Sequence, residues 1–257
     1  MLGRLFEAAA SDSAAREREL SFEALAAKAS ATPQPVDAYR ALARSSQIKL
    51  IAEIKRASPS RGELASITDP AAHALGYENA GAHAISVLTE RTGFKGSLQD
   101  LESVSAAVKI PTLRKDFIST EYQILEAKVA GASMVLLILA HLPAEGFRRL
   151  YEYAESIGLS VLVETHSEAE IDVAADINSK LIGINTRNLQ TFETDIGLFE
   201  RMAARLPEQC IRVAESSVKQ IDDVRRYRDS GADVVLVGEA LVTGDYSTLI
   251  PQIVSVS

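Results

Sequence analysis

The chain has 257 residues, of which 47% are hydrophobic and 24% charged, and its formal net charge is −8. This balance is typical of a globular protein, excludes fibrous and disordered classes, and argues against a protein that coats nucleic acid. No apolar run reaches the roughly 20 residues that cross a bilayer, and the N-terminus is too charged for a signal peptide, so we expect a cytoplasmic protein with no membrane partner.

The numbers and positions of cysteine and histidine residues indicate which metal sites and disulfides the chain could form. A single cysteine, Cys210, excludes an internal disulfide, and the four histidines (His73, His83, His141 and His166) show no metal-ligand spacing. We therefore expect neither a metal nor another cofactor.

The first 46 residues have helical character, and we expect residues 1–46 to form an extension that precedes the main fold. Short β-branched or leucine-rich runs then predict eight strands: Ile48–Lys55, Ala84–Leu88, Thr112–Arg114, Met134–Ile138, Ser160–Glu164, Leu181–Asn185, Ile211–Glu215 and Val234–Val237. Helical periodicity marks the segments Glu121–Ala130, Ala144–Ser156, Glu168–Ala174, Ile196–Arg205 and Val218–Ser230. This alternation requires parallel strands joined by crossover helices.

Three junctions look alike: AGAHAISVL from Ala80, AGASMVLLI from Ala130 and SGADVVLVG from Ser230. Each has a glycine between the end of a helix and the next strand, as in a helix C-cap followed by a tight turn. The repeated units predict a single (β/α)8 TIM barrel domain over residues 1–257. The alternative is a doubly wound sheet. Such a sheet would carry a glycine-rich dinucleotide loop where this chain has KRASPSRG, in which Pro59 disfavours a helix start.

Charged and amide side chains gather at the carboxyl ends of the predicted strands: Glu53, Lys55, Lys115, Asp116, Glu164, Asn185, Arg187, Glu215 and Ser216. In a barrel these ends converge on one mouth, where active sites are built. Glu53 and Lys55 are two positions apart, so both are expected to face the barrel interior.

Several of these groups also have a purely structural interpretation. Glu53 and Lys55 could form an ion pair in a polar layer of the barrel, and Lys115 could be a surface lysine. Asn185 and Arg187 could hold a loop in place. His166, two residues after Glu164, is open to a catalytic and to a structural interpretation. Burying a carboxylate that has no partner or function costs free energy. The presence of so many polar groups at one rim therefore favours a functional site.

Lysines and glutamates without a cofactor motif suit proton transfer on a small organic anion. We expect burial to raise the pKa of a carboxyl group and neighbouring cations to lower the pKa of a lysine, giving an acid and a base near neutral pH. A phosphate site is expected at the loops Ala214–Val218 and Val237–Leu241, through backbone N–H groups, with Lys55 and Ser58–Gly62 on the other side.

Together the motifs resemble the indole-3-glycerol phosphate synthase family of tryptophan biosynthesis. The matching stretches are EIKRASPSRG, SVLTERTGFKGS, PTLRKDFISTEYQI, GASMVLLI, LVETH, IGINTRNL, VAESS and ADVVLVGEALV. They cover the chain from Ile51 to Val242, nearly the whole predicted barrel.

The resemblance implies a lyase that closes 1-(2-carboxyphenylamino)-1-deoxyribulose 5-phosphate to indole-3-glycerol phosphate, releasing carbon dioxide and water. It implies Lys115 as general acid and Glu164 as the group for later proton abstraction and dehydration. Lys55 would contact phosphate and share the acid role, Glu53 would orient it, and Asn185 would position the reacting region. The implied catalytic set is Lys115, Glu164, Lys55, Glu53, Asn185 and Glu215.

The resemblance also implies a substrate-binding set. Four residues would frame the aromatic ring (Ser58, Pro59, Phe94 and Phe117), Arg187 would lie near the carboxylate, and four would hold phosphate (Ser216, Ser217, Gly238 and Glu239). The implied partner is a small phosphorylated substrate. We expect a monomer, with contacts to other tryptophan-pathway enzymes as an open alternative.

Two features depart from the family or match it only in kind. Ser217 stands where the family usually has glycine, and we expect an ordinary negative φ there, with the hydroxyl contacting phosphate; the alternative is a strained left-handed backbone. The family's helical extension lies over the barrel mouth, and LSFEALAAKA is the segment expected to form it here.

Two other functions remain as alternatives. A phosphosugar isomerase barrel such as phosphoribosylanthranilate isomerase would share the phosphate loops. It would use a different acid–base pair and lack the loop that begins with EIK at Glu53 and continues through ASPS. An inactive barrel that only binds a ligand or another pathway enzyme is disfavoured because both Lys115 and Glu164 are present.

Overall fold

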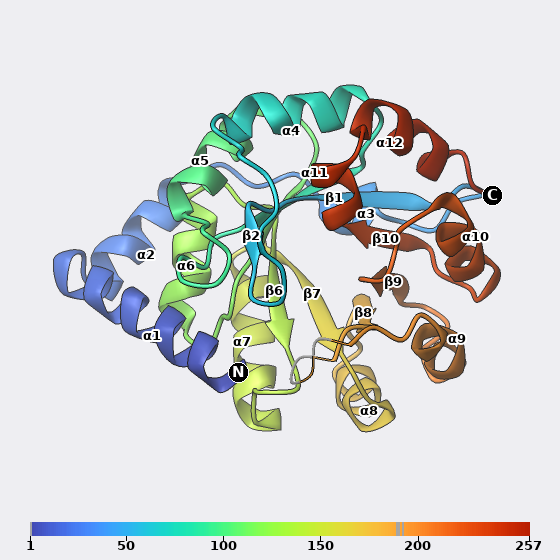
Figure 1. The fold of residues 1–257 in the computed structure, drawn as a ribbon. Helices are drawn as coiled ribbons and strands as arrows, with labels where there is room; N and C mark the ends of the chain where they lie inside the picture. The colour runs from blue at the N-terminus through green and yellow to red at the C-terminus, as the bar shows by residue number, and fades with distance from the viewer. Residues whose placement is uncertain (1, 189–190, 192) are drawn as a thin grey trace.

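The computed structural model describes residues 2–188, 191 and 193–257, so Met1 of the predicted extension and Leu189 of the IGINTRNL motif lie outside the described residues. Eight parallel strands close into a barrel in the order β1, β10, β9, β8, β7, β6, β5, β4 (Figure 1). They are β1 (Lys49–Ile54), β4 (Ala84–Leu88), β5 (Thr112–Lys115), β6 (Met134–Ile138), β7 (Ser160–Thr165), β8 (Leu181–Asn185), β9 (Ile211–Glu215) and β10 (Val234–Val237). The barrel prediction is confirmed, and the doubly wound alternative is excluded because β1 pairs with β10, Lys49 opposite Val234.

Helices connect the strands and surround the barrel: α4 (Pro70–Asn79), α5 (Leu98–Ala107), α6 (Glu121–Val129), α7 (Ala144–Ser156), α8 (Glu168–Asp176), α9 (Gly197–Ala203), α10 (Ile221–Asp229), α11 (Glu239–Thr243) and α12 (Tyr246–Val254). The eight predicted strands match the observed ones to within one residue at each end. Helix α10 begins three residues later than expected because the N–H groups of Lys219 and Gln220 donate to the Asp223 carboxylate, which caps the helix. Among the described residues, no helix is both long and apolar enough to cross a membrane.

The loop after β1 contains a short hairpin that sequence patterns did not predict. Strands β2 (Ala57–Ser58) and β3 (Gly62–Glu63) pair antiparallel. Gly62 has a φ of 69°, a left-handed conformation that glycine adopts without steric cost. The ASPSRG stretch therefore forms a defined projection beside the mouth.

The three predicted glycine turns are confirmed. Gly81, Gly131 and Gly231 have φ values of 108°, 82° and 91°, and each lies directly between a helix and the strand that follows. Such backbone is unfavourable for residues with a Cβ atom, which explains the repeated glycine.

The barrel interior changes character along its axis. Apolar side chains from successive strands fill the lower layers, including Ile51, Leu113, Leu162, Val213 and Leu236. Above them, at the carboxyl ends of the strands, buried polar side chains take their place, including Glu53, Glu164 and Glu215. The barrel interior thus has a polar layer at the carboxyl ends of the strands, above closely packed apolar layers.

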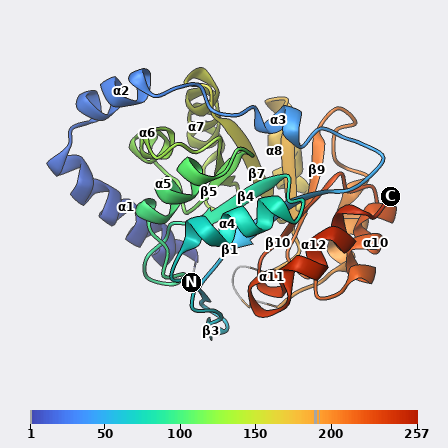
Figure 2. The same cartoon turned by 90° about the horizontal axis from the view of Figure 1, so that it is seen from above.

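The N-terminal extension consists of α1 (Leu2–Glu19), α2 (Phe22–Ala31) and α3 (Ala38–Ala41). Figure 2 shows α1 and α2 beside α6, with α3 well separated from them. Leu25 and Ala29 of α2 pack on Tyr122 and Leu125 of α6. The segment LSFEALAAKA therefore covers the flank of the barrel.

The two ends of the extension contact opposite ends of the barrel. Leu2 and Leu5 of α1 line the cavity at the mouth. In α3, the Tyr39 hydroxyl accepts a hydrogen bond of 2.9 Å from the N–H of Val161, near the amino end of β7. Only the start of the extension lies at the mouth.

A buried charge network joins the extension to β5. Arg114, 1% exposed, pairs with Asp116 at 2.9 Å and with Glu126 of α6 at 3.2 Å. Glu126 also pairs with Arg16 of α1. Because these charges are removed from water, each depends on its partners.

We predict that Arg114→Ala lowers the free energy of unfolding by about 3–5 kcal/mol, because it leaves the buried Asp116 carboxylate without its cationic partner and leaves Glu126 paired with Arg16 alone. The control is Arg205→Ala. Arg205 pairs with Asp172 where both side chains are about half exposed, at 52% and 48%, and the expected loss is about 0–1 kcal/mol. Urea denaturation of both variants measures the difference, and equal losses would contradict the role of burial.

Candidate active site

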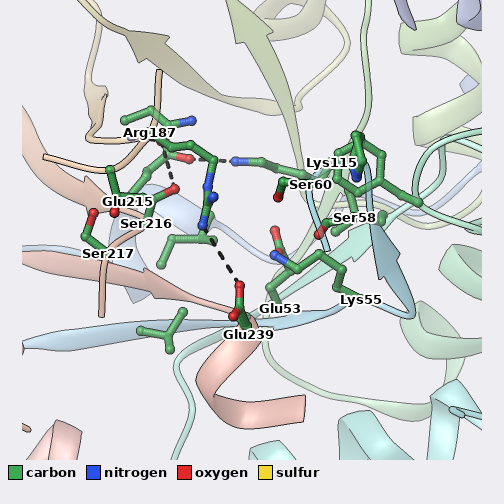
Figure 3. A pocket seen from close by; sticks show the side chains of 18 of the residues that line it. Glu53, Lys55, Ser58, Ser60, Lys115, Arg187, Glu215, Ser216, Ser217 and Glu239 are labelled. Carbon is green, nitrogen blue, oxygen red and sulfur yellow. Dashed lines mark hydrogen bonds and ion pairs between the residues drawn. The ribbon is translucent and has the colours of Figure 1, made fainter. Parts of the chain in front are cut away.

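A cavity of about 540 Å³ opens at the carboxyl ends of the barrel strands. All of the residues assigned to catalysis or substrate binding from the sequence line it, from Glu53 on β1 to Glu239 at the start of α11. Figure 3 shows the labelled side chains converging from the walls of this cavity. The strand-end pattern therefore located one common site.

Lys115, Glu164 and Glu215 form the centre of the site. The Lys115 ammonium lies 2.6 Å from Oε2 of Glu215 and 3.2 Å from Oε2 of Glu164. The carboxylate side chains are only 1–2% exposed, whereas the lysine side chain is 13% exposed and reaches the cavity. They come from β5, β7 and β9, alternate strands whose inward side chains share one layer.

The charge state of Lys115 differs from the sequence-based expectation. Burial disfavours its ammonium, but Glu215, Glu164 and Glu53 outweigh burial and raise the pKa of Lys115. The expectation of a lowered pKa was wrong because carboxylates surround this amine, while Lys55, which also lines the cavity, is paired with Glu53. Lys115 is therefore held in its charged ammonium form.

The two central carboxyl groups have opposite pKa shifts. Burial raises the pKa of Glu215 to about 7, with repulsion from Glu164 adding to the effect. Burial also acts on Glu164, but Lys115, His166 and a hydrogen bond from Asn185 together lower its pKa. One site therefore holds an ionised carboxylate and a second carboxyl group that titrates near neutrality, the division that acid–base catalysis requires.

Two glycines make room for the buried carboxylates. A Cβ atom at Gly183 would collide with Oε1 of Glu215, and one at Gly238 would collide with Oε1 of Glu53. Gly238 was expected only as a phosphate contact, and Gly183 was not singled out. Only the register of neighbouring strands reveals this second reason for glycine.

Lys55 and Glu53 form an ion pair of 2.8 Å on the cavity wall, with side-chain exposures of 16% and 6%. Their two-residue spacing was expected to direct both into the barrel interior, and this is confirmed. The pair is at once the structural ion pair considered from sequence and a part of the site.

Asn185 links the central charges to the loop after β9. Its Oδ1 accepts hydrogen bonds from the Ser216 hydroxyl at 2.8 Å and from the Arg187 N–H at 3.0 Å. A side-chain hydrogen bond joins Asn185 to Glu164. The amide therefore couples the position of Glu164 to the position of the expected phosphate loop.

Glu239, at the first position of α11, pairs with Arg61 at 2.9 Å and approaches Arg187 at 3.9 Å. Arg61 belongs to the loop Ser58–Gly62 and was not singled out individually. Its charge in a loop expected to close an anion pocket is the signal that could have identified it. Two guanidinium groups thus lie at the rim next to the proposed phosphate loops.

The expectation of an ordinary negative φ at Ser217 was wrong. Its φ is 63°, and that of Ser216 is 71°, so two consecutive non-glycine residues adopt left-handed backbone. The Ser217 hydroxyl lies 2.6 Å from Oγ1 of Thr186, which is itself 3.1 Å from the Tyr227 hydroxyl. The side chain is thus held by the protein, and this anchoring compensates part of the backbone strain.

No group of three or more histidine, cysteine, aspartate or glutamate side chains in the described part of the chain is arranged to hold a metal ion. The absence of a metal requirement stays a prediction.

Comparison with known proteins gives a consistent result. A family model described as indole-3-glycerol phosphate synthase matches residues 2–252. The indole-3-glycerol phosphate synthase of Leifsonia xyli subsp. xyli is 52% identical over 245 residues, covering 95% of this chain and 94% of the relative. That of Mycolicibacterium gilvum is 50% identical over 256 residues, covering 99% and 94%.

A solved structure shows the same fold at low sequence similarity. Thiamine phosphate pyrophosphorylase from Pyrococcus furiosus superposes with a TM-score of 0.59 at 14% identity, covering 80% of this chain and 93% of that one. At this identity the likeness concerns the barrel alone.

We predict that Ser217→Gly is more stable than Ser217→Ala by about 1 kcal/mol, because both lose the hydroxyl but only alanine keeps the left-handed strain. The measurement is the free energy of unfolding of the two variants in urea. Equal stabilities would show that the backbone at this position carries no strain.

We predict a pH-dependent difference between the wild type and Glu215→Gln. The pKa of Glu215 is about 7 in the folded protein against 4.5 ordinarily, so between these values the native state holds a proton that the unfolded chain has lost. Wild-type stability should therefore fall relative to the variant from about pH 5 to pH 7, by at most about 1.4 kcal/mol per unit, and level off above that window. Denaturation series at several pH values measure this, and a constant difference would contradict the raised pKa.

Proposed function

The chain belongs to the indole-3-glycerol phosphate synthase family of tryptophan biosynthesis, whose members are carboxy-lyases, and from this premise we propose how its cavity performs the reaction. The proposed substrate is 1-(2-carboxyphenylamino)-1-deoxyribulose 5-phosphate. The proposed products are indole-3-glycerol phosphate, carbon dioxide and water.

The observation that carries this proposal is the position of the Lys115 ammonium between Glu164 and Glu215, at the closed end of the cavity. A charged donor and an ionised acceptor lie 3.2 Å apart there, so one substrate can meet both without large movement.

In the first step, the ring carbon that bears the carboxylate attacks the keto carbon of the sugar chain. Lys115 donates a proton to the keto oxygen as the carbon–carbon bond forms, which prevents build-up of alkoxide charge. Carbon dioxide then leaves, and the electrons of the broken bond restore the aromatic ring.

In the second step, Glu164 removes a proton from the methylene carbon beside the nitrogen, and the new hydroxyl leaves as water. Two protons are delivered to oxygen and one is taken from carbon, so an ionised substrate takes up one proton per turnover. Glu215, 2.6 Å from Lys115 and titrating near 7, is placed to restore the proton that Lys115 has donated. Lys55, oriented by Glu53, supports the acid role from the carboxyl end of β1.

The rest of the cavity suits the two ends of the substrate. Phe94 and Phe117, with ring centroids 6.1 Å apart, form an apolar wall with Ser58 and Pro59 for the aromatic ring. Arg187 would meet the substrate carboxylate. The phosphate would lie against the loops that contain Ser216, Ser217, Gly238 and Glu239, mainly on backbone N–H groups.

A phosphosugar isomerase would also use such phosphate loops, but it would neither release carbon dioxide nor need a wall for a ring that becomes an indole. Release of carbon dioxide together with indole fluorescence therefore distinguishes the two functions.

We predict that Lys115→Ala and Glu164→Gln each lower kcat by about 100-fold or more, since each removes a general acid–base group. Indole fluorescence during substrate consumption measures the rate. Matched controls are Lys180→Ala, at a lysine 55% exposed and paired with Glu155, and Glu168→Gln, an exposed carboxylate of α8. A variant of Lys115 or Glu164 that turns over like these controls would remove that residue from the mechanism.

A further inference from the structure

His166 lies directly behind the proposed base. It follows the last residue of β7, and its Nε2 is 3.4 Å from Oε1 of Glu164. The other oxygen of that carboxylate, Oε2, faces Lys115. The two carboxylate oxygens therefore face cationic groups on opposite sides.

Glu170 holds the imidazole from its outer side. Its Oε2 lies 3.6 Å from Nδ1 of His166 and accepts the backbone N–H of His166 at 2.8 Å. Its Oε1 accepts a hydrogen bond from the Ser167 hydroxyl. Because Ser167 caps α8, the clamp is fixed to the start of that helix.

The environment of His166 favours its charged form. Both ring nitrogens are buried, and neither has a hydrogen-bond partner of ideal geometry among the described residues. Three carboxylates act on it: Glu164 on β7, Glu170 on α8 and Glu215 on β9. Burial works against the imidazolium, but these carboxylates outweigh burial and raise the pKa of His166.

We propose that His166, clamped by Glu170, is a positioning residue that keeps Glu164 ionised and aims its free electron pairs at the cavity. Charges alternate along the row Glu170, His166, Glu164, Lys115, Glu215, so each group stabilises the next. His166 does not line the cavity and acts only through Glu164. The catalytic part of this inference rests on the proposed function.

The first test follows Glu164 itself in the substrate-free protein. Side-chain carboxyl groups are labelled with ¹³C in glutamate, and the Glu164 signal is identified by its loss in Glu164→Gln. In His166→Gln the Glu164 titration should move up by about one pH unit, because an opposite charge within about 4–6 Å has been removed. An unchanged midpoint would overturn the proposal whatever the activity.

The second test is the pH profile of kcat. Because the pKa of Glu164 lies below its ordinary value, His166→Gln should lower kcat about 10-fold only on the acid side of the profile, and raising the pH should recover it. At a pH well below both midpoints, a one-unit shift leaves about a tenth as much ionised base as in the wild type. His166→Lys restores a cation and should move the profile back toward the wild type. A uniform loss at all pH values, with no rescue by lysine, would show a merely structural role.

Glu170→Gln provides a variant that does not touch Glu164 and keeps the size of the side chain. It should shift the profile in the same direction, whereas the exposed neighbour on the same helix, Glu168→Gln, should leave it unchanged. Equal behaviour of these two variants would overturn the role of the clamp. If the wild type does not turn over the substrate, the proposed function fails, and the carboxyl titration alone decides the role of His166.

Discussion

The constraint on which this site depends is the burial of charge around the Lys115 ammonium. Taking an ammonium and two carboxylates out of water costs several kcal/mol per ion unless each finds its partner in good geometry. The barrel meets this requirement by directing side chains from β5, β7 and β9 into one layer, where Lys115 lies 2.6 and 3.2 Å from its two carboxylates. Burial raises the pKa of Glu215, whereas Lys115, His166 and a hydrogen bond from Asn185 lower the pKa of Glu164, so the electrostatics that could destabilise the fold also prepare the groups of the proposed acid–base chemistry.

Position 115 lies between two charge networks that serve different purposes. Arg114 and Asp116, the residues on either side, join the network that reaches Glu126 and the N-terminal helix through Arg16. Lys115 points the other way, into the cavity, because side chains alternate along a strand. The extension is therefore tied to the strand that carries the proposed acid.

At the rim, strained backbone and two guanidinium groups, those of Arg61 and Arg187, lie where an anion is expected. Ser216 and Ser217 both adopt left-handed backbone, and hydrogen bonds to Asn185 and Thr186 hold their side chains in place. Glu239 meanwhile engages Arg61 and approaches Arg187. Backbone held away from its preferred conformation persists only where surrounding contacts determine it, and such places are often ligand sites. The loop that binds phosphate in the proposal is thus preorganised by its neighbours.

The sequence by itself determined the architecture and the membership of the site. Hydrophobic periodicity and the residue types of turns are local properties of a sequence. They were therefore enough to predict the eight strands, the three glycine turns and the polar residues at the strand ends, such as Glu53 and Glu164. Tertiary structure alone decided the rest, because it depends on which strands are neighbours and what each side chain meets. The raised pKa of Lys115 follows from carboxylates 49 and 100 positions away in the chain. The need for glycine at 183 follows from Glu215 on the adjacent strand, and the left-handed turn at Ser217 is supported by contacts to Thr186 and its neighbours. No local pattern carries such information, since it arises only when the barrel closes.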